Sequence, residues 1–288
     1  ALSDLGRYEE AIDKYDQALQ FKPDLPQAWN SRGFVLSALR CYEEAIDKYD
    51  QALQFKSDYH EAWYNRGNAL SDLGRYEEAI ASYDQALCFK PDLHEAWYNL
   101  GVALSNLGRY EEAIASYDQA LRFKPDLPQA WNNQGVALSD LGRYEEAIDK
   151  YDQALHFKPN LHEAWYGRGV VLHNLGLYKE AIASYDRALQ IKPDKHEAWY
   201  NRGIVLSSLG CYRDALASYD QAIEFKPDHA NAYYNKACCY GLQGEIDLAI
   251  AALQTAIDLD SEYRDLAKTD TDFDQIRADA VFQALIST

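Results

Sequence analysis

Histidines recur at a fixed interval in this sequence: His60, His94, His162 and His196 are separated by 34 residues or by a multiple of 34. Imidazole is a common zinc ligand, and zinc holds its ligands at about 2 Å. If each interval forms helices packed side by side, successive histidines lie about 8–10 Å apart. One ion cannot bridge such a row. We therefore expect these histidines to start helices, and we predict no metal and no other cofactor.

Paired carboxylates are a second candidate for chemistry, and they follow the same interval in Glu77–Glu78, Glu111–Glu112 and Glu145–Glu146. General acid–base catalysis needs one carboxyl group in an apolar pocket that raises its pKa. Repetition in successive intervals favours a structural role instead, because negative charge at a helix start interacts favourably with the helix dipole. The sequence also has no nucleophile-and-base arrangement and no complete glycine-rich fingerprint. We predict that the chain is not an enzyme.

All these residues belong to a 34-residue repeat. Tryptophan marks it at Trp29, Trp63, Trp97, Trp131, Trp165 and Trp199, and Tyr233 takes the next place. Numbering the positions of a repeat from His60 gives seven full repeats over residues 26–263, with a partial repeat over residues 1–25. We therefore expect the chain to be a piece of a longer protein. Residues 264–288 lose the tryptophan and proline marks but keep apolar residues such as Phe273 and Phe282, which predicts capping helices and a true C-terminus.

Each repeat predicts two amphipathic helices joined by a turn. Gly74 interrupts the helical pattern between the two helices of one repeat, and Pro91 ends the second helix. Asp92 and Glu95 match a capping box for the next helix. Glycine at position 8 and alanine at position 20 predict close helix crossings. One helix pair leaves an apolar side open, so stability must come from stacking on the neighbouring repeats.

The composition limits the class of protein. A net charge of −18 argues against nucleic-acid binding, which relies on clustered lysine and arginine. No apolar stretch is long enough to span a bilayer, so we predict no membrane insertion. Five cysteines without CxxC spacing favour reduced thiols and a cytoplasmic location; the alternative is a vicinal disulfide between Cys238 and Cys239.

The repeat is built on the motifs Trp-x3-Gly-x2-Leu, Gly-x-Tyr, Ala-Ile-x2-Tyr-x2-Ala and Pro, in this order. This arrangement resembles the tetratricopeptide repeat, in the form found in bacterial multi-repeat arrays. This resemblance implies an all-α fold, a right-handed α-solenoid superhelix of helix–turn–helix units. It also implies that the first helices line a concave groove that binds peptides or proteins. The chain departs from the family at position 7, where leucine is usual.

Position 7 holds mostly cations here: Arg32, Arg66, Arg168, Arg202 and Lys236, with Leu100 and Gln134 in the other two repeats. A buried cation needs a partner, because an uncompensated buried charge is costly. Position 25 offers an aspartate in nearly every repeat, so we predict that Arg66 pairs with Asp50 or Asp84. The alternative is that the arginine heads reach water.

Position 6 carries asparagine in most repeats, and the family geometry points this position into the groove. These residues are Asn65, Asn99, Asn133, Asn201 and Asn235, a row similar to the asparagine ladder of the O-GlcNAc transferases. A carboxamide can donate to and accept from a peptide backbone, so we expect the row to bind an extended peptide. The alternative is that each asparagine bonds within its own helix pair.

Position 5 adds tyrosines that suit an adaptable binding surface: Tyr64, Tyr98, Tyr166, Tyr200 and Tyr234. The same rings could equally pack between layers. The repeat over residues 162–195 differs from the others by Gly167 at position 6 and His173 at position 12. We therefore expect His173 and its surroundings to contribute selectivity.

Three functions fit these patterns. The first is a non-enzymatic scaffold that binds a partner peptide or protein segment in the groove. The second is the regulatory or substrate-recruiting arm of a larger enzyme, such as a glycosyltransferase, kinase or protease. The third is a structural solenoid that associates with copies of itself. The sequence alone does not identify the partner.

Overall fold

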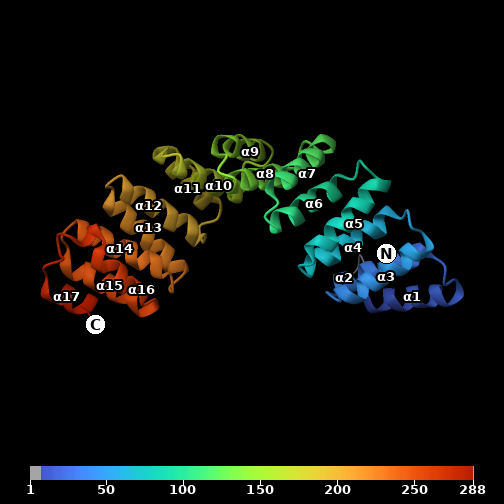
Figure 1. Ribbon diagram of the computed structural model, residues 1–288, viewed down its shortest axis with the longest axis horizontal. Helices are drawn as coiled ribbons and strands as arrows, with labels where there is room; N and C mark the ends of the chain where they lie inside the picture. The colour runs from blue at the N-terminus through green and yellow to red at the C-terminus, as the bar shows by residue number, and fades with distance from the viewer. Residues whose placement is uncertain (1–7, 288) are drawn as a thin grey trace. The chain divides into compact units, whose positions relative to one another are not determined.

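The computed structural model describes residues 8–287 and is helical, with no strand in that range (Figure 1). Helix α1 (Tyr8–Phe21) precedes seven helix pairs. These are α2 (Pro26–Ala38) with α3 (Tyr42–Phe55), α4 (His60–Asp72) with α5 (Tyr76–Phe89), α6 (His94–Asn106) with α7 (Tyr110–Phe123), α8 (Pro128–Asp140) with α9 (Tyr144–Phe157), α10 (His162–Asn174) with α11 (Tyr178–Ile191), α12 (His196–Ser208) with α13 (Tyr212–Phe225), and α14 (Ala230–Leu242) with α15 (Ile246–Leu259). The predicted all-α class and its helix–turn–helix repeats are confirmed.

The chain divides into two compact units, Ala1–Arg143 and Tyr144–Thr288. The first unit holds α1 to α8, and the second holds α9 onward. Within each unit, every helix packs on the next one in the chain. The first helices of neighbouring repeats also contact each other, as α4 and α6 do in the first unit and α12 and α14 do in the second.

The turn inside each pair follows from one glycine. Gly108 adopts a φ of +72°, a left-handed conformation that glycine reaches without steric cost. The next residue, Arg109, then donates its backbone N–H to the carbonyl of Leu104 at 2.9 Å, which closes the end of α6 in a Schellman-type turn. Arg40 takes the glycine's place between α2 and α3, with a φ of +62°.

The repeated tryptophan fixes the turn between repeats. The indole N–H of Trp97 donates to the carbonyl of Pro91 at 2.9 Å, and Trp199 does the same with Pro193 at 2.8 Å. In the loop before α4, Ser57 replaces the proline, and its carbonyl accepts from Trp63 at 2.9 Å. Each tryptophan therefore ties its helix to the loop that leads into it.

The predicted capping box is wrong. Helix α6 begins after Leu93, which serves as its N-cap without any side-chain cap bond. The backbone N–H groups of Ala96 and Trp97 both donate to the Leu93 carbonyl. Asp92 belongs instead to the preceding turn, one residue too early to reach the free N–H groups of α6.

The crossing of the two helices in a pair depends on the glycine at position 8. A Cβ atom added to Gly101 would lie 2.5 Å from Cε1 of Tyr117, far inside the contact distance of two carbons. Tyr117 is 1% exposed, and the equivalent tyrosines are buried to a similar degree. Burial raises the pKa of Tyr117 to about 12, so the hydroxyl is protonated at neutral pH.

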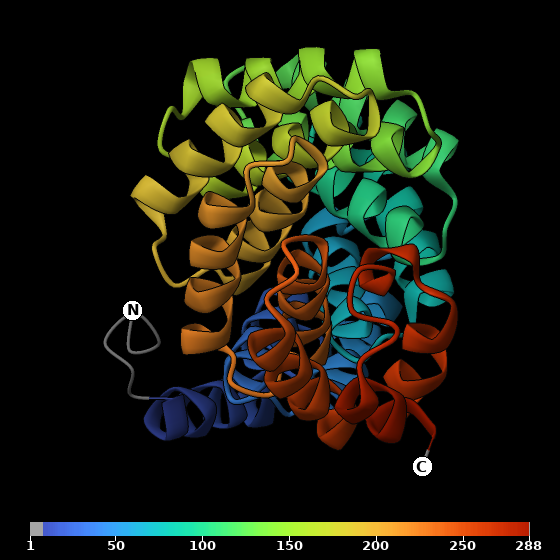
Figure 2. The same ribbon diagram turned by 90° about the vertical axis from the view of Figure 1, so that its left-hand side faces the viewer.

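Three short elements follow the last pair: α16 (Glu262–Thr269), the 3-10 helix η2 (Thr271–Phe273) and α17 (Ala280–Ser287). Helices α16 and α17 pack on α15 and on each other, and η2 packs on α14, at the red end of the ribbon in Figure 2. Phe273, Ile276, Phe282 and Ile286 are buried there. The division into a partial repeat at 1–25, seven repeats and a cap from residue 264 stays a prediction, and residues 1–7 lie outside the described residues.

No helix within residues 8–287 has the length and apolar character needed to cross a membrane.

Candidate functional site

The cations at position 7 pair across repeats, as predicted. Arg66 on α4 lies 2.7 Å from Asp50 on α3, and its Nη1 also donates to Ser82 on α5 at 2.7 Å. The same ion pair, between a cation and the aspartate 16 residues earlier, joins Arg32 to Asp16, Arg168 to Asp152, Arg202 to Asp186 and Lys236 to Asp220. Gln134 donates to Asp118 in the same geometry at 2.7 Å. The partner is the aspartate of the preceding repeat, so each pair fastens one layer to the next.

Leu100 breaks this row and leaves Asp84 without the usual cation. Leu100 is 5% exposed and joins the apolar core of the first unit. Partial loss of hydration therefore raises the pKa of the Asp84 carboxyl, while the charge of Arg109 lowers it to a smaller extent. Asp50 and Asp84 thus occupy the same position in consecutive repeats, but only Asp50 has an arginine of the next repeat as its partner.

This difference predicts unequal effects of one substitution. Asp50→Ala should lower the free energy of unfolding by about 1–2 kcal/mol, because Arg66, whose side chain is 19% exposed, loses its carboxylate. Asp84→Ala, the matched control, should change it by less than about 0.5 kcal/mol. Urea unfolding followed by tryptophan fluorescence measures both, and equal losses would contradict the layer-fastening role of the pair.

The asparagines at position 6 bond to the preceding repeat. Nδ2 of Asn99 donates to the Tyr64 hydroxyl at 3.2 Å and to Oδ1 of Asn68 at 2.9 Å. Asn133, Asn201 and Asn235 donate in the same way to Tyr98, Tyr166 and Tyr200, at 3.0–3.2 Å. Asn65 donates to Asn30, which replaces the tyrosine, at 3.1 Å. The structure therefore brings the predicted asparagine and tyrosine rows into direct contact.

The tyrosines at position 5 also pack on the tyrosine of their own second helix. The ring centroids of Tyr64 and Tyr83 are 6.1 Å apart, and Tyr98 with Tyr117, Tyr166 with Tyr185 and Tyr200 with Tyr219 repeat this tilted arrangement. Burial raises the pKa of Tyr64 and Tyr98. These rings thus pack between helices, and the asparagine side chains sit on their hydroxyl ends.

A small pocket recurs between neighbouring first helices. In the first unit, one pocket of about 280 Å³ lies between α4 and α6, and a second of about 270 Å³ lies between α6 and α8. A third, of about 300 Å³, lies between α12 and α14 in the second unit. Each is lined by the buried tyrosine of the second helix, serine at position 12 and the next repeat's asparagine at position 6, as in Tyr83, Ser71 and Asn99. Similar sites therefore occur in both units, at intervals set by the 34-residue repeat.

Asn99, Asn133 and Asn235 line these pockets, whereas none of the predicted tyrosines does. The predicted site residues do not include the aspartates at position 13, Asp72 on α4 and Asp140 on α8, which line the two pockets of the first unit. They also do not include position 9, where Asn68, Val102 and Ile204 differ in polarity. Both positions lie on the same helical face as position 6, with position 9 one turn later and position 13 two turns later.

His173 alters its own repeat. In two other repeats the serine at position 12 bonds to the buried tyrosine, Ser37 to the Tyr49 hydroxyl and Ser105 to the Tyr117 hydroxyl, each at 3.2 Å. Where His173 replaces serine, the hydroxyl of Tyr185 is buried without a hydrogen-bond partner among the described residues. The imidazole lies 5.9 Å from the ring of Tyr178, and burial lowers its pKa.

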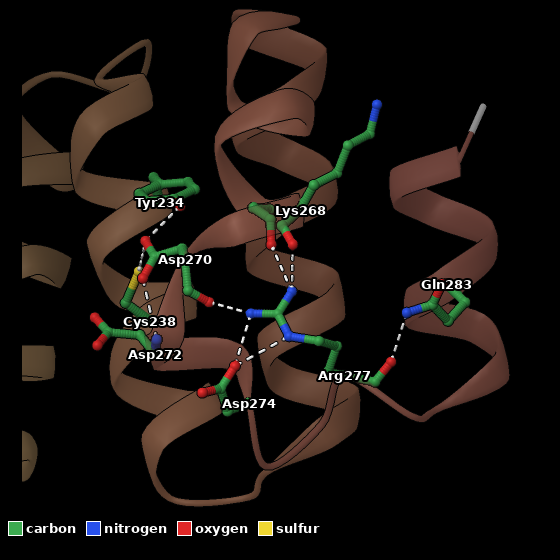
Figure 3. Close-up of polar contacts among 9 residues, drawn as sticks. Tyr234, Cys238, Lys268, Asp270, Asp272, Asp274, Arg277 and Gln283 are labelled. Carbon is green, nitrogen blue, oxygen red and sulfur yellow. Dashed lines mark hydrogen bonds and ion pairs between the residues drawn. The ribbon is translucent and has the colours of Figure 1, made fainter.

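Tyr234 lies beneath the C-terminal helices (Figure 3). It is 5% exposed, donates to Oδ2 of Asp270 at 2.6 Å and stacks on Tyr263 with ring centroids 4.8 Å apart. Cys238 lies beside it, and ligand atoms of Cys238, Asp270 and Asp272 fall within 4.8 Å of one another. Burial and the nearby carboxylates raise the pKa of the Cys238 thiol, which donates to Asp270. This protonated form is a poor metal ligand.

Arg277 holds the loop that carries these aspartates (Figure 3). Its guanidinium donates to the backbone carbonyls of Lys268 and Asp270 and to the carboxylate of Asp274. The cluster is thus built into the packing of the C-terminal helices on α14.

Comparison with protein families matches models of this repeat along most of the chain. The TPR repeat model matches residues 1–39, 42–74 and 67–108. Tetratricopeptide repeat models match residues 98–162 and 135–196, then 178–228, and then 230–263. A comparison with curated protein sequences gives no match.

Solved structures share the fold. YrrB, described as a TPR protein with an unusual peptide-binding site, is 26% identical, with 65% of this chain and 97% of YrrB covered and a TM-score of 0.57. PilF of Pseudomonas aeruginosa is 18% identical, and the match covers 76% of this chain and 96% of PilF with a TM-score of 0.62. The C-terminal part of a TPR repeat-containing protein from Cytophaga hutchinsonii is 17% identical, with 85% and 98% covered and a TM-score of 0.68.

Proposed function

Because the chain belongs to the tetratricopeptide repeat family, we propose that it is a non-enzymatic scaffold that binds a segment of a partner protein against its first helices. The observation that carries this proposal is the pocket that recurs between neighbouring first helices, lined each time by an asparagine at position 6. A row of equivalent sites suits a ligand that is itself a regular chain.

The size and chemistry of the pockets favour a peptide over a small molecule. At about 270–300 Å³ each, they fall at or below the lower end of sites for drug-sized ligands. One such pocket accommodates a side chain, and the polar groups around it can bond to the backbone on either side. The similarity to YrrB, a TPR protein with a peptide-binding site, supports the same class of ligand.

The ionisable groups support a binding role over catalysis. The arginines of position 7 are occupied by ion pairs between repeats, and the buried tyrosines are held protonated by their raised pKa values. Neither set is free to act as a general base at neutral pH.

The proposal is tested by capturing the partner and mapping its bound segment. The immobilised chain would be exposed to an extract of the source cells, and the bound partner would be digested to find the protected segment. That segment, synthesised and titrated against the chain, supplies an affinity for comparing variants. A captured partner with no protected segment would contradict groove binding.

The double variant Asn99→Ala/Asn133→Ala should weaken binding of the mapped segment about tenfold or more, because both asparagines line pockets. It should also cost about 1 kcal/mol of stability per lost internal bond. Tyr64→Phe/Tyr98→Phe is the matched control, since it removes hydroxyls to which the same amides donate but leaves the pocket linings intact. Fluorescence anisotropy measures the affinities, and thermal melting measures the stabilities.

If the two double variants lose affinity equally, the asparagines act as internal struts and do not contact the ligand. If neither loses affinity, the segment binds elsewhere on the chain. Both outcomes would overturn the role proposed for Asn99 and Asn133.

A further inference from the structure

His229 takes a place at the contact between α12 and α14 that an aliphatic side chain takes in the first unit. It is the N-cap residue of α14, and its half-buried imidazole lies beside the ring of Tyr200 on α12, with centroids 4.7 Å apart. Leu93 and Leu127 are at the same position of their repeats, and both pack against the apolar core of the first unit. A titratable ring therefore replaces leucine at this contact.

The preceding repeat shows how a permanent cation is accommodated at this position. Nζ of Lys195 lies 4.4 Å from the ring centroid of Tyr166 and 3.6 Å from the carboxylate of Glu197, and the lysine side chain is only 18% exposed. The ring face attracts the ammonium group, and the carboxylate compensates its charge. In the next repeat Asn231 replaces this glutamate, and the first turn of α14 has no acidic residue. A protonated His229 therefore lacks the partner that Lys195 has.

The charged groups around His229 come from α12, from the end of α13 and from the loop between α13 and α14. The ring of His196, at the start of α12, meets the His229 ring edge-on with centroids 5.6 Å apart. Burial lowers the pKa of His229, and the charges of Lys226 and His196 lower it further. Asp228 and Glu197 act in the opposite direction to a smaller extent. The surroundings thus favour the neutral imidazole.

His196 has little capacity to accept a charged neighbour. Its Nδ1 is buried without a hydrogen-bond partner among the described residues. A proton on that nitrogen would be an unsatisfied buried donor, which is costly. The two imidazoles therefore pack well only while both are neutral.

The His229 ring is connected to the pocket between α12 and α14. The hydroxyl of Tyr200 accepts a hydrogen bond from Nδ2 of Asn235 at 3.2 Å, and Asn235 lines that pocket together with Ile204. Direct contacts thus lead from the loop before α14, through the Tyr200 ring, to the pocket. A displacement of His229 frees the ring that positions Asn235.

We propose that His229 is a pH-sensitive contact that holds α14 against α12 when it is neutral and loosens this junction when it is protonated. Protonation places a positive charge beside His196 and Lys226 without adding a carboxylate partner, so the charged ring moves toward water. The switch itself needs no ligand, whereas its effect on binding at the pocket between α12 and α14 rests on the proposed function.

NMR of the imidazole Cε1–H groups in the full chain measures the titration of His229. The signal is assigned by its loss in His229→Leu, and its midpoint should lie below the ordinary histidine value of about 6.5. The unfolded chain then binds the proton more readily, so the contact contributes fully above about pH 7 and is lost as the pH falls through 6.5 and the folded pKa. A midpoint at or above the ordinary value would overturn the proposal.

Asn231→Glu tests whether the missing carboxylate is the cause. It supplies at an exposed position the group that Glu197 gives to Lys195, and it should raise the His229 midpoint by about 0.5 or more. Asn231→Gln adds the same length without charge and should leave the midpoint within about 0.2 of its original value. Equal midpoints in the two variants would contradict the charge argument and the switch with it.

Hydrogen exchange of the α14 amides measures the loosening. Between about pH 7.5 and about pH 5.5, protection factors in α14 should fall about threefold or more in the unmodified chain, after correction for the intrinsic pH dependence of exchange. His229→Leu carries the residue that the first unit has at this position and should limit the fall to less than about 1.5-fold. Equal falls in the two chains would show that another group is responsible.

These measurements use the chain without a ligand, so the two proposals fail separately. A His229 that titrates at the ordinary value would remove the switch and leave the scaffold function intact. A captured partner without a protected segment would contradict groove binding, while the titration of His229 and the exchange of α14 would still decide the switch.

Discussion

Replacing Phe273 by alanine is expected to lower the free energy of unfolding of the second unit by about 3–5 kcal/mol. The ring is fully buried, with its centroid 5.9 Å from that of Tyr234 and 5.3 Å from that of Phe282. It also lies against Gly241 of α14, where an added Cβ would come within 2.9 Å of the ring. A cavity at this position removes the contact between the last helix pair and the elements that cover it.

Val281→Ala in α17 is the control for Phe273→Ala, because Val281 is 60% exposed and its loss should cost less than about 0.5 kcal/mol. Urea unfolding followed by circular dichroism measures both. A Phe273→Ala variant as stable as Val281→Ala would show that residues after α15 are not needed to complete the core, which would contradict the capping role predicted for residues 264–288.

Gly101→Ala is expected to lower the free energy of unfolding by about 1–3 kcal/mol, even though alanine is the better helix former. The added methyl would overlap the Tyr117 ring, which is buried against the apolar core of the first unit. Relief requires the ring or the whole helix to move. Thermal and urea unfolding of the variant measure the loss.

A double-mutant cycle shows whether the ring is the cause. In a Tyr117→Leu background, the change of Gly101 to alanine should cost at least about 1 kcal/mol less than in the unmodified chain, because the smaller side chain leaves room for the methyl. Additive effects of the two substitutions would contradict the contact explanation.

The repeat architecture could be predicted from the sequence because its signals are local and recur. Gly74, Gly108 and their equivalents each close a helix with positive φ. Each repeat buries the same alanine, and each repeat except the last, where Leu253 takes the place, buries the same tyrosine. The Arg66–Asp50 pair could also be predicted, because a cation beside a core stripe limits the partners that can satisfy it. The capping-box prediction failed because it depended on the exact residue at which α6 begins, which the turn after Lys90 determines.

The details of the candidate site were harder to predict. Asn99 contacts Tyr64, 35 residues earlier, only because side chains of two repeats meet between α4 and α6. Whether an amide faces a ligand or a neighbouring hydroxyl depends on that packing, and the asparagine pattern is the same in both cases. Asp72 and Asp140 differ from many other surface acids of this chain only by their place beside a pocket.

Val102 on α6 lines both pockets of the first unit, the one between α4 and α6 and the one between α6 and α8, and this has a consequence for local unfolding. A transient opening of the α6–α7 pair dismantles both pockets at once, whereas an opening of α4–α5 dismantles only one. A ligand that spans both pockets binds none of the states in which α6 is detached, so it suppresses those states by mass action. Amide hydrogens in α6 then exchange with solvent more slowly than before, and the middle helix of the three becomes the most protected part of the bound surface.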